Sequence, residues 1–190
     1  MPGAELSPEA RERILAALEH DQEGRVFADF LQAEVSPDGA TALLFYDRWE
    51  YHMGAESAKV ALATRDGAIL RAFPFDANST VSGFFRAAWQ EDSSQVAIDL
   101  GGVVLIWSVP ASRFALACVT FSVSSVEWVA DALLVRESKY RVRKSGGYYA
   151  DGPAGARFPL AGLRWREATE LSELWTIAER EPRRAASKLG

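Results

Sequence analysis

The sequence predicts a mainly β protein of antiparallel, blade-like meanders, with one helix near each end. Three observations lead to this prediction. Short runs rich in β-branched and aromatic residues alternate with tight turns through residues 26–160. One order of strand, Asp-containing turn, strand and glycine-containing turn recurs there about three times. Segments with the apolar spacing of a helix flank this β body on both sides.

The clearest run of predicted strands lies within residues 84–121. Its most strand-like part is residues 103–109, which are dense in β-branched and aromatic side chains. Gly101-Gly102 forms the tight turn before it, because glycine accepts the positive φ of a hairpin turn. Pro110 ends it, since proline cannot donate to a central ladder. Four short strands joined by such turns predict an antiparallel meander.

The same rhythm appears before and after this segment. Residues 32–76 contain strand-like runs with a Ser-Pro-Asp-Gly turn at 36–39, and a third round begins at Val126. The first two units start at Glu34 and Ala88, about 54 residues apart, and the next start follows about 39 residues later. A propeller repeat is about 40–50 residues long. Three units leave an open propeller, a sandwich and one bent sheet as alternatives.

The central unit resembles one blade of a WD-repeat-type β-propeller. Trp89 is followed by an Asp-Ser-Ser turn, a small apolar strand, a Gly-Gly turn and a strand that ends at Trp107. The family closes this strand with Trp-Asp, whereas Ser108 follows Trp107 here, and the Gly-His pair of the family is missing. The resemblance covers about one blade and implies a propeller-like arrangement of the meanders.

An N-terminal helix is predicted over residues 7–23. Ser7 is a favoured N-cap residue, Pro8 fits the first helical position, and Gly24 is a plausible C-cap. Four apolar residues have the spacing of one helical stripe: Ala10, Ile14, Ala17 and Leu18. This helix is expected to cover a face or an edge of a sheet.

A C-terminal helix is predicted over residues 167–180, ended by Pro182, with residues 183–190 as a mobile polar tail. Its apolar stripe consists of Leu171, Leu174, Trp175 and Ala178. We expect the tryptophans in strand contexts to be core residues and the remaining two to be candidates for exposure: Trp89, Trp107 and Trp128, against Trp49 and Trp165. Residues 1–190 are expected to form a single domain.

Composition argues against several classes of protein. No apolar stretch approaches the eighteen residues of a membrane span, and the N-terminus lacks the pattern of a signal peptide. Cys118 is the only cysteine, so no internal disulfide forms, and a cytoplasmic location is expected. The excess of arginine over lysine indicates a GC-rich bacterial genome. No phosphate-binding loop, nucleophile elbow or zinc motif is present, so no metal or cofactor is expected.

The net charge of −5 is unevenly distributed along the chain. Residues 1–130 carry 18 acidic and 9 basic residues, a net charge of −9, whereas residues 131–190 carry 8 acidic and 12 basic residues, a net charge of +4. Such asymmetry fits an anionic partner at the basic end, but it also fits internal charge pairing or a homodimer.

The first candidate site is the segment from Asp47 to His52. His52 near a carboxylate is suited to general-base chemistry. In an extended segment Arg48, Glu50 and His52 share one face, whereas Trp49 and Tyr51 share the other. The alternative is a solvated extension of a hairpin with two aromatic residues packed beneath it.

The second candidate site is the segment 136–149, which alternates basic and aromatic residues. On a strand, Lys139, Arg141 and Arg143 face one side, and Gly146-Gly147 turns the chain toward a pair of tyrosines, Tyr148 and Tyr149. Arginine and tyrosine are typical of interaction hot spots. A charged edge strand that blocks aggregation is the alternative, and the acidic body argues against nucleic acid.

These observations favour a non-catalytic protein-recognition module that acts as an adaptor or an inhibitor of another protein. The partner-binding residues would be those of both candidate segments: Lys139, Arg141, Arg143, Tyr148, Tyr149, Trp49, Tyr51 and His52. The alternative is a small-ligand-binding protein or a hydrolase-type enzyme that uses the Asp47–His52 segment.

Overall fold

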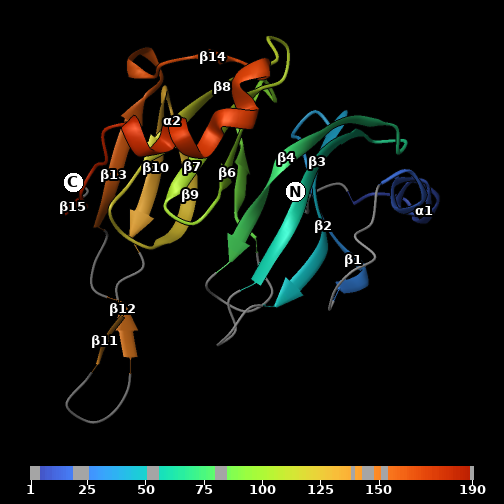
Figure 1. Ribbon diagram of the computed structural model, residues 1–190, viewed down its shortest axis with the longest axis horizontal. Coiled ribbons are helices and arrows are strands. Elements are labelled where there is room, and N and C mark those ends of the chain that lie inside the picture. The colour runs from blue at the N-terminus through green and yellow to red at the C-terminus, as the bar shows by residue number, and fades with distance from the viewer. Residues whose placement is uncertain are drawn as a thin grey trace. The chain divides into compact units, whose positions relative to one another are not determined.

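The computed structural model describes residues 5–18, 26–50, 56–79, 85–137, 140–142, 148–150 and 154–188 (Figure 1). The chain divides into two compact units, Met1–Gln95 and Val96–Gly190, and each is described by itself. The sequence predicts that residues 1–190 form a single domain, and cooperative unfolding of the two units stays a prediction. Both units are mainly β, as the sequence predicts. None of the helices among these residues is long and apolar enough to span a bilayer.

The first unit is built on a meander of four strands that are hydrogen-bonded in chain order, each antiparallel to the next. A short fifth strand follows within the unit. The elements are α1 (Pro8–Ala17), β1 (Val26–Val35), β2 (Thr41–Glu50), β3 (Glu56–Thr64), β4 (Ile69–Ser79) and β5 (Ala87–Trp89).

Helix α1 packs on one face of this sheet. Its buried side chains join a cluster that also contains residues of β1, β2 and β3: Ile14, Leu18, Leu31, Ala42, Leu44, Tyr46, Ala61 and Ala63. The predicted N-cap is confirmed, because the Ser7 side chain accepts a hydrogen bond from the Ala10 amide at 3.1 Å. The helix therefore covers a sheet face, as the sequence predicts.

The helix ends earlier than the predicted residue 23. Its last residue is Ala17, and Leu18 follows in an extended conformation with φ −81° and ψ 142°. The extended backbone lets Leu18 remain buried in the cluster, whereas Ala17, predicted on the apolar stripe, is exposed. The predicted C-cap at Gly24 lies outside the described residues.

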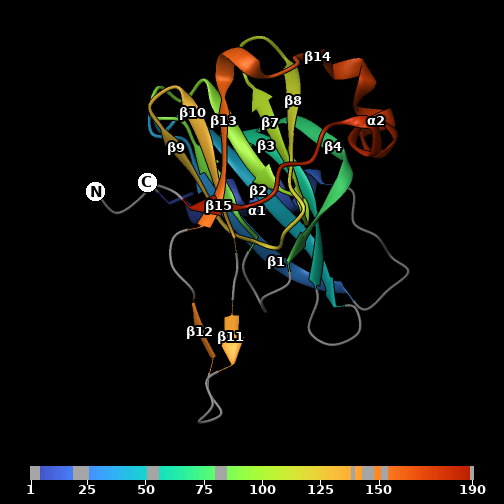
Figure 2. The same cartoon turned by 90° about the vertical axis from the view of Figure 1, so that its left-hand side faces the viewer.

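The second unit contains two larger sheets and one two-stranded sheet (Figure 2). Within this unit the larger sheets have the orders β14-β8-β7-β6 and β15-β13-β10-β9, and β11 pairs with β12. The strands are β6 (Gln95–Asp99), β7 (Val103–Ser108), β8 (Arg113–Cys118), β9 (Val123–Val129), β10 (Ala132–Glu137), β11 (Tyr140–Val142), β12 (Tyr148–Ala150), β13 (Ala154–Pro159), β14 (Arg166–Glu167) and β15 (Ser187–Lys188). The meanders expected from the sequence correspond to β1–β4 in the first unit, and to β6–β8 and the β9, β10, β13 set in the second.

The C-terminal helical region is a 3-10 helix, η3 (Ala168–Glu173), that continues into α2 (Leu174–Arg180). This combination corrects the prediction that Trp175 lies on the buried stripe, because Trp175 is 47 % exposed. A 3-10 helix has three residues per turn, so its buried positions recur every three residues. Leu171 and Leu174 are accordingly both buried. In α2 the buried residues Leu174, Ile177 and Ala178 then follow the spacing of an α-helix, and Trp175 lies outside that stripe.

The burial of the other tryptophans depends on the element that carries them. Trp107 in β7 is 2 % exposed and is a core residue, as predicted. Trp89 and Trp128, which were also expected in the core, are only half-buried, since they lie on short or outer strands. Trp49 and Trp165, the two candidates for exposure, are half-buried too.

The predicted mobile tail has regular partners in the structure. Arg184 forms a parallel bridge with Val119, and β15 pairs with the start of β13. The backbone of Arg184 thus pairs at the end of β8, and Ser187 and Lys188 pair at the start of β13, which the polar composition of the segment did not indicate.

Candidate functional site

The first candidate segment begins at a bulge in β2. Tyr46 pairs with Lys59 and Trp49 pairs with Ser57, so two residues of β2 lie opposite one residue of β3. The first of the two, Asp47, has a φ of 48°. Asp tolerates this left-handed conformation better than most residues, but it still indicates a local constraint. The simple alternation predicted for this segment is therefore interrupted at its start.

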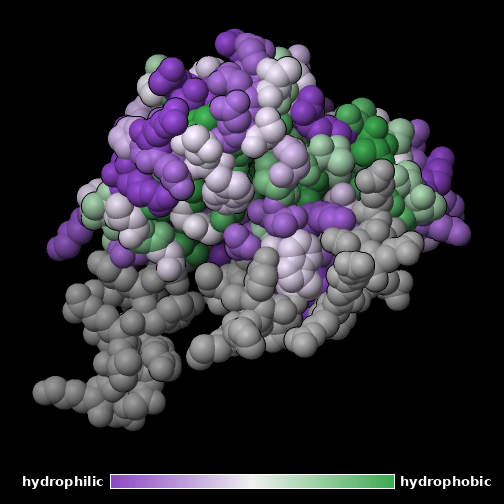
Figure 3. Space-filling model, in the orientation of Figure 1, coloured by the Kyte–Doolittle hydropathy of each residue, from purple (hydrophilic) through white to green (hydrophobic). Residues whose placement is uncertain are grey.

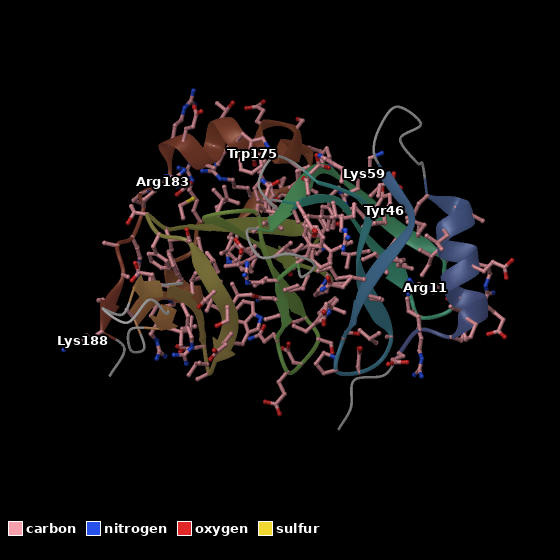
Figure 4. The ribbon with its side chains drawn as sticks, turned by 90° about the horizontal axis from the view of Figure 1, so that it is seen from below. Arg11, Tyr46, Lys59, Trp175, Arg183 and Lys188 are labelled. Atoms are coloured by element: carbon pink, nitrogen blue, oxygen red, sulfur yellow. The ribbon has the colours of Figure 1, made fainter. Side chains whose placement is uncertain are left out.

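Asp47 is fully buried and forms an ion pair. Its Oδ2 atom lies 3.4 Å from Nζ of Lys59, whose side chain is 26 % exposed. Tyr46 and Lys59, directly opposite each other in the ladder, mark this part of the sheet in Figure 4. A buried carboxylate is unfavourable without a partner, so the lysine offsets the loss of hydration at this position.

A second ion pair and a hydroxyl network lie on the neighbouring strands. Nε of Arg48 is 3.6 Å from Oε2 of Glu56, whose side chain is 7 % exposed. The buried Ser57 hydroxyl lies 3.2 Å from the Ala77 carbonyl oxygen and 3.1 Å from Oδ1 of Asn78. Strands β2 and β3 thus bring together two acids and two bases, so the charges of these four residues balance.

Several of these residues were missing from the sequence-based site. Lys59, Glu56 and Ser57 come from β3, and only the strand register places them beside Asp47 and Arg48. The one available signal was the presence of charged residues in an otherwise apolar strand. Tyr51 and His52 lie outside the described residues, so the expected general-base role stays a prediction.

The second candidate segment forms the β11–β12 hairpin. Arg141 stands directly opposite Tyr149 in the ladder, and Val142 stands opposite Tyr148. The predicted pair of strands is therefore present. Lys139, Arg143 and the Gly-Gly turn lie outside the described residues.

This hairpin lies between two strands, β10 and β13, that could be joined by a much shorter connection. β10 and β13 pair directly with each other, from Ala132 with Pro159 to Arg136 with Gly155. Two residues suffice to join β9 and β10, yet residues 138–153 separate β10 and β13. Among the described strands, β11 and β12 pair only with each other, and both Figure 1 and Figure 2 show them apart from β10 and β13. Long excursions from a compact sheet frequently carry function.

Among the described residues, the large exposed apolar side chains do not gather into one patch. Figure 3 shows hydrophilic and hydrophobic residues interspersed over one face of the molecule. The large exposed hydrophobic residues of the described chain lie on three different elements: Leu70 on β4, Val129 on β9 and Trp175 on α2. Within the same described ranges, no three side chains of the His, Cys, Asp or Glu type gather as metal ligands.

Comparison with models of known protein families and with curated proteins finds no match to this chain. The likeness to a WD-repeat blade therefore depends on the residues of the central meander alone.

In two turns of the first meander, a side-chain hydroxyl donates a hydrogen bond to an aspartate two residues later. The Ser36 hydroxyl donates to Oδ1 of Asp38 at 2.6 Å, and the Thr64 hydroxyl donates to Asp66. These hydrogen bonds hold the pKa of Asp38 and the pKa of Asp66 below the usual value of an aspartate. Both turns connect consecutive strands, which indicates a structural role for their low-pKa acids.

Proposed function

We propose that the protein is a non-catalytic protein-recognition module whose contact surface is the β11–β12 hairpin. The observation that supports the proposal most directly is the excursion of residues 138–153, which leaves the β10–β13 ladder and returns to it. Arg141 and Tyr149 occupy opposite positions in this hairpin, and arginine and tyrosine dominate interaction hot spots.

Charge indicates the kind of partner. The hairpin belongs to the only net-basic part of the chain, residues 131–190 with a net charge of +4. A protein surface that presents carboxylates beside an apolar spot would pair with the arginine and lysine residues and would also cover the tyrosines. Nucleic acid fits less well, because the whole chain has a net charge of −5. Trp49, Tyr51 and His52 form the secondary candidate surface in this proposal.

We also propose that the meanders follow one another as blade-like units. Gln32 of β1 exchanges two hydrogen bonds with the Phe85 backbone, through its Nε2 at 2.9 Å and its Oε1 at 3.2 Å. The Trp89 indole donates to the Glu34 carbonyl at 2.8 Å. The partners are 53 and 55 residues apart, close to the predicted repeat spacing. A cytoplasmic location remains part of the proposal, based on the single Cys118.

A crosslinking experiment tests the recognition proposal. A photoreactive residue is introduced in place of Tyr149, and a second variant carries it in place of the exposed Thr169 on η3. We expect the Tyr149 variant to crosslink one protein of defined mass in cells, whereas the Thr169 variant does not. Equal crosslinking from both positions, or none from Tyr149, contradicts the proposal.

A double substitution then tests the two named residues. Arg141→Glu with Tyr149→Ala should abolish capture of the crosslinked partner and leave the melting temperature nearly unchanged. The matched control is Arg164→Glu with Trp175→Ala, which makes the same charge reversal and a comparable aromatic truncation at exposed positions of the same unit. Capture that survives the hairpin substitutions, with the fold intact, places the interface elsewhere. If the double variant no longer folds, Arg141 and Tyr149 have a structural role instead.

The second candidate function is small-ligand binding or hydrolysis at the Asp47–His52 segment. It is favoured by one observation, the fully buried Asp47 with its left-handed backbone, since backbone constraint and buried charge concentrate at functional sites. Hydrolysis of p-nitrophenyl acetate or p-nitrophenyl phosphate that disappears in His52→Ala would support this function. Turnover that is equal in both proteins, or no turnover at all, would rule out a hydrolase that depends on His52.

A further inference from the structure

The C-terminal segment, residues 183–188, first contacts the end of β8. The Arg184 amide donates to the Cys118 carbonyl at 2.9 Å, and the Thr120 amide donates to the Arg184 carbonyl at 3.1 Å. The Arg183 guanidinium donates to the Val119 carbonyl at 3.1 Å. These bonds fix the segment in a parallel bridge beside β8.

The same segment then contacts β13. Nη1 of Arg184 donates to the Arg157 carbonyl at 2.5 Å, and its guanidinium carbon lies 4.7 Å from the centre of the buried Phe158 ring. Cation–π contact with a buried ring is more favourable than with an exposed one. Figure 4 shows Arg183 and Lys188, which bound the segment, in the second unit.

The last contacts are the β15 ladder. Ser187 pairs with Gly155, and Lys188 pairs with Ala154. Ala154 and Gly155 are the first residues of β13, where the chain re-enters the sheet after the hairpin excursion. β15 is therefore located at the returning leg of the hairpin.

The outgoing leg has its own attachment. The Ser124 hydroxyl of β9 lies 3.3 Å from the carbonyl oxygens of both Arg136 and Glu137, the last residues of β10. The sheet order β15-β13-β10-β9 thus puts the two legs of the hairpin on the two central strands, with one flanking strand on each side.

We propose that residues 183–188 are a positioning strap for the β11–β12 hairpin. The strap converts the start of β13 from an edge strand into a central strand, so that both legs of the hairpin leave from a paired backbone. This assignment builds on the proposed recognition function, because it concerns how the hairpin is presented to a partner. The strap makes Arg184 and Ser187 positioning residues that need not touch the partner.

The physical argument depends on how the strap is held. Most of its side chains are exposed, and the segment is held by hydrogen bonds, a short ladder and one arginine stacked on a ring. Segments with few buried apolar contacts open locally without global unfolding. Releasing the strap should therefore loosen the start of β13 and the hairpin while the buried strands of the same unit remain protected.

A matched pair of variants tests this assignment. Ser187→Pro puts a residue with a fixed φ and no backbone N–H into the β15 ladder, whereas Ser187→Ala removes only the hydroxyl, which lies 3.5 Å from the Gly155 carbonyl. Amide hydrogen exchange is followed in residues 154–158, in β11 and β12, and in β7 as the control for the fold. We expect exchange at 154–158 and in the hairpin to rise about tenfold in Ser187→Pro, with β7 unchanged and Ser187→Ala close to the parent.

Unchanged exchange at residues 154–158 in Ser187→Pro, or in a chain that ends at Pro182, overturns the strap. Exchange that rises at 154–158 but not in the hairpin overturns the positioning role. Faster exchange in β7 as well makes the segment a general stability element and equally overturns that role. These readouts need no partner. The two proposals can fail separately. If exchange changes as expected but the hairpin substitutions leave partner capture intact, the recognition proposal is wrong and the positioning role of the strap remains supported.

Discussion

Two tryptophans of the second unit have opposite environments. Trp107 pairs with Phe114 across the β7–β8 ladder, and both are almost completely buried. Trp175 is 47 % exposed on α2. The residue type alone does not distinguish them, since both occur in strongly apolar runs. Burial follows from the element in each case: a strand covered on both faces for Trp107, and a helix whose phase is set by the preceding 3-10 turns for Trp175.

We expect Trp107→Ala to reduce the free energy of unfolding by about 3–5 kcal/mol, because it leaves a large cavity in a packed sheet. Trp175→Ala, the matched control, should change it by less than about 0.5 kcal/mol. Denaturant melts of the two variants provide the measurement. A loss below about 1 kcal/mol for Trp107→Ala would mean that the surrounding strands do not form the core seen here.

Asp38 illustrates a residue whose neighbour determines its acidity. The Ser36 hydroxyl and the Ala40 amide both donate to its carboxylate, at 2.6 and 3.0 Å, and lower its pKa. The unfolded chain, with the higher pKa, then takes up the proton first as the pH falls. The stabilisation is complete above the unfolded pKa of about 4 and is lost as the pH falls through the folded value.

The stability difference between pH 7 and pH 3 should therefore be smaller in Asp38→Asn than in the parent. Urea melts at the two pH values measure it. Glu91→Gln, which removes an acid from an exposed position, is the control. An equal difference in parent and Asp38→Asn would show that the turn hydrogen bonds do not favour the charged form.

The sequence predicts turns at this scale better than it predicts partners. The Ser-Pro-Asp-Gly turn follows from local backbone preferences, and Asp38 indeed lies in a turn that connects β1 and β2. The segment that begins at Asp47 was recognised from its composition. Its partners Lys59 and Glu56 belong to another strand, and strand register is determined by contacts that no local pattern contains.

At the scale of elements, α1 lies very close to the turn between β3 and β4. Gly67 has a φ of 98°, and a Cβ atom there would lie 2.8 Å from the Ala10 carbonyl oxygen and 3.2 Å from Cβ of Arg13. Glycine is favoured at this position for two reasons. The backbone has a positive φ, and the close approach of the helix leaves no room for a Cβ atom.

Gly67→Ala should cost about 1–2 kcal/mol from the left-handed backbone alone, with the steric conflict against α1 in addition. Gly162→Ala is the matched control, since a Cβ atom there meets nothing within 4 Å. Thermal melts compare the two. A Gly67→Ala protein as stable as the Gly162→Ala protein would mean that α1 is not docked on this turn.

The strands themselves follow from the sequence more completely than the ends of the elements. Period and composition are sufficient for β7, which lies within the predicted strand-like run 103–109. The early end of α1 at Ala17 depends on Leu18 reaching the cluster in an extended conformation. The pairing of β15 depends on free backbone positions at the start of β13, which a polar sequence does not indicate.

For the whole molecule, the expected single domain has a thermodynamic meaning. We expect one unfolding transition, with calorimetric and van't Hoff enthalpies that agree. Gly67→Ala in the first unit and Trp107→Ala in the second should both shift this same transition. Two separate transitions, each sensitive to only one of the variants, would show that the units are independent domains.

The hydrogen bonds between β1 and residues 85–89 have a consequence for the nascent chain. Sheet β1–β4 is complete once Ser79 has emerged from the ribosome, but the outer edge of β1 is still open. Its partners Phe85 and Trp89 follow Ser79 by six and ten residues. At about 5–20 residues per second, the open edge is exposed to neighbouring nascent chains for roughly two seconds or less. The indole of Trp89 then occupies the Glu34 carbonyl, so this backbone group of β1 is no longer available for intermolecular β pairing.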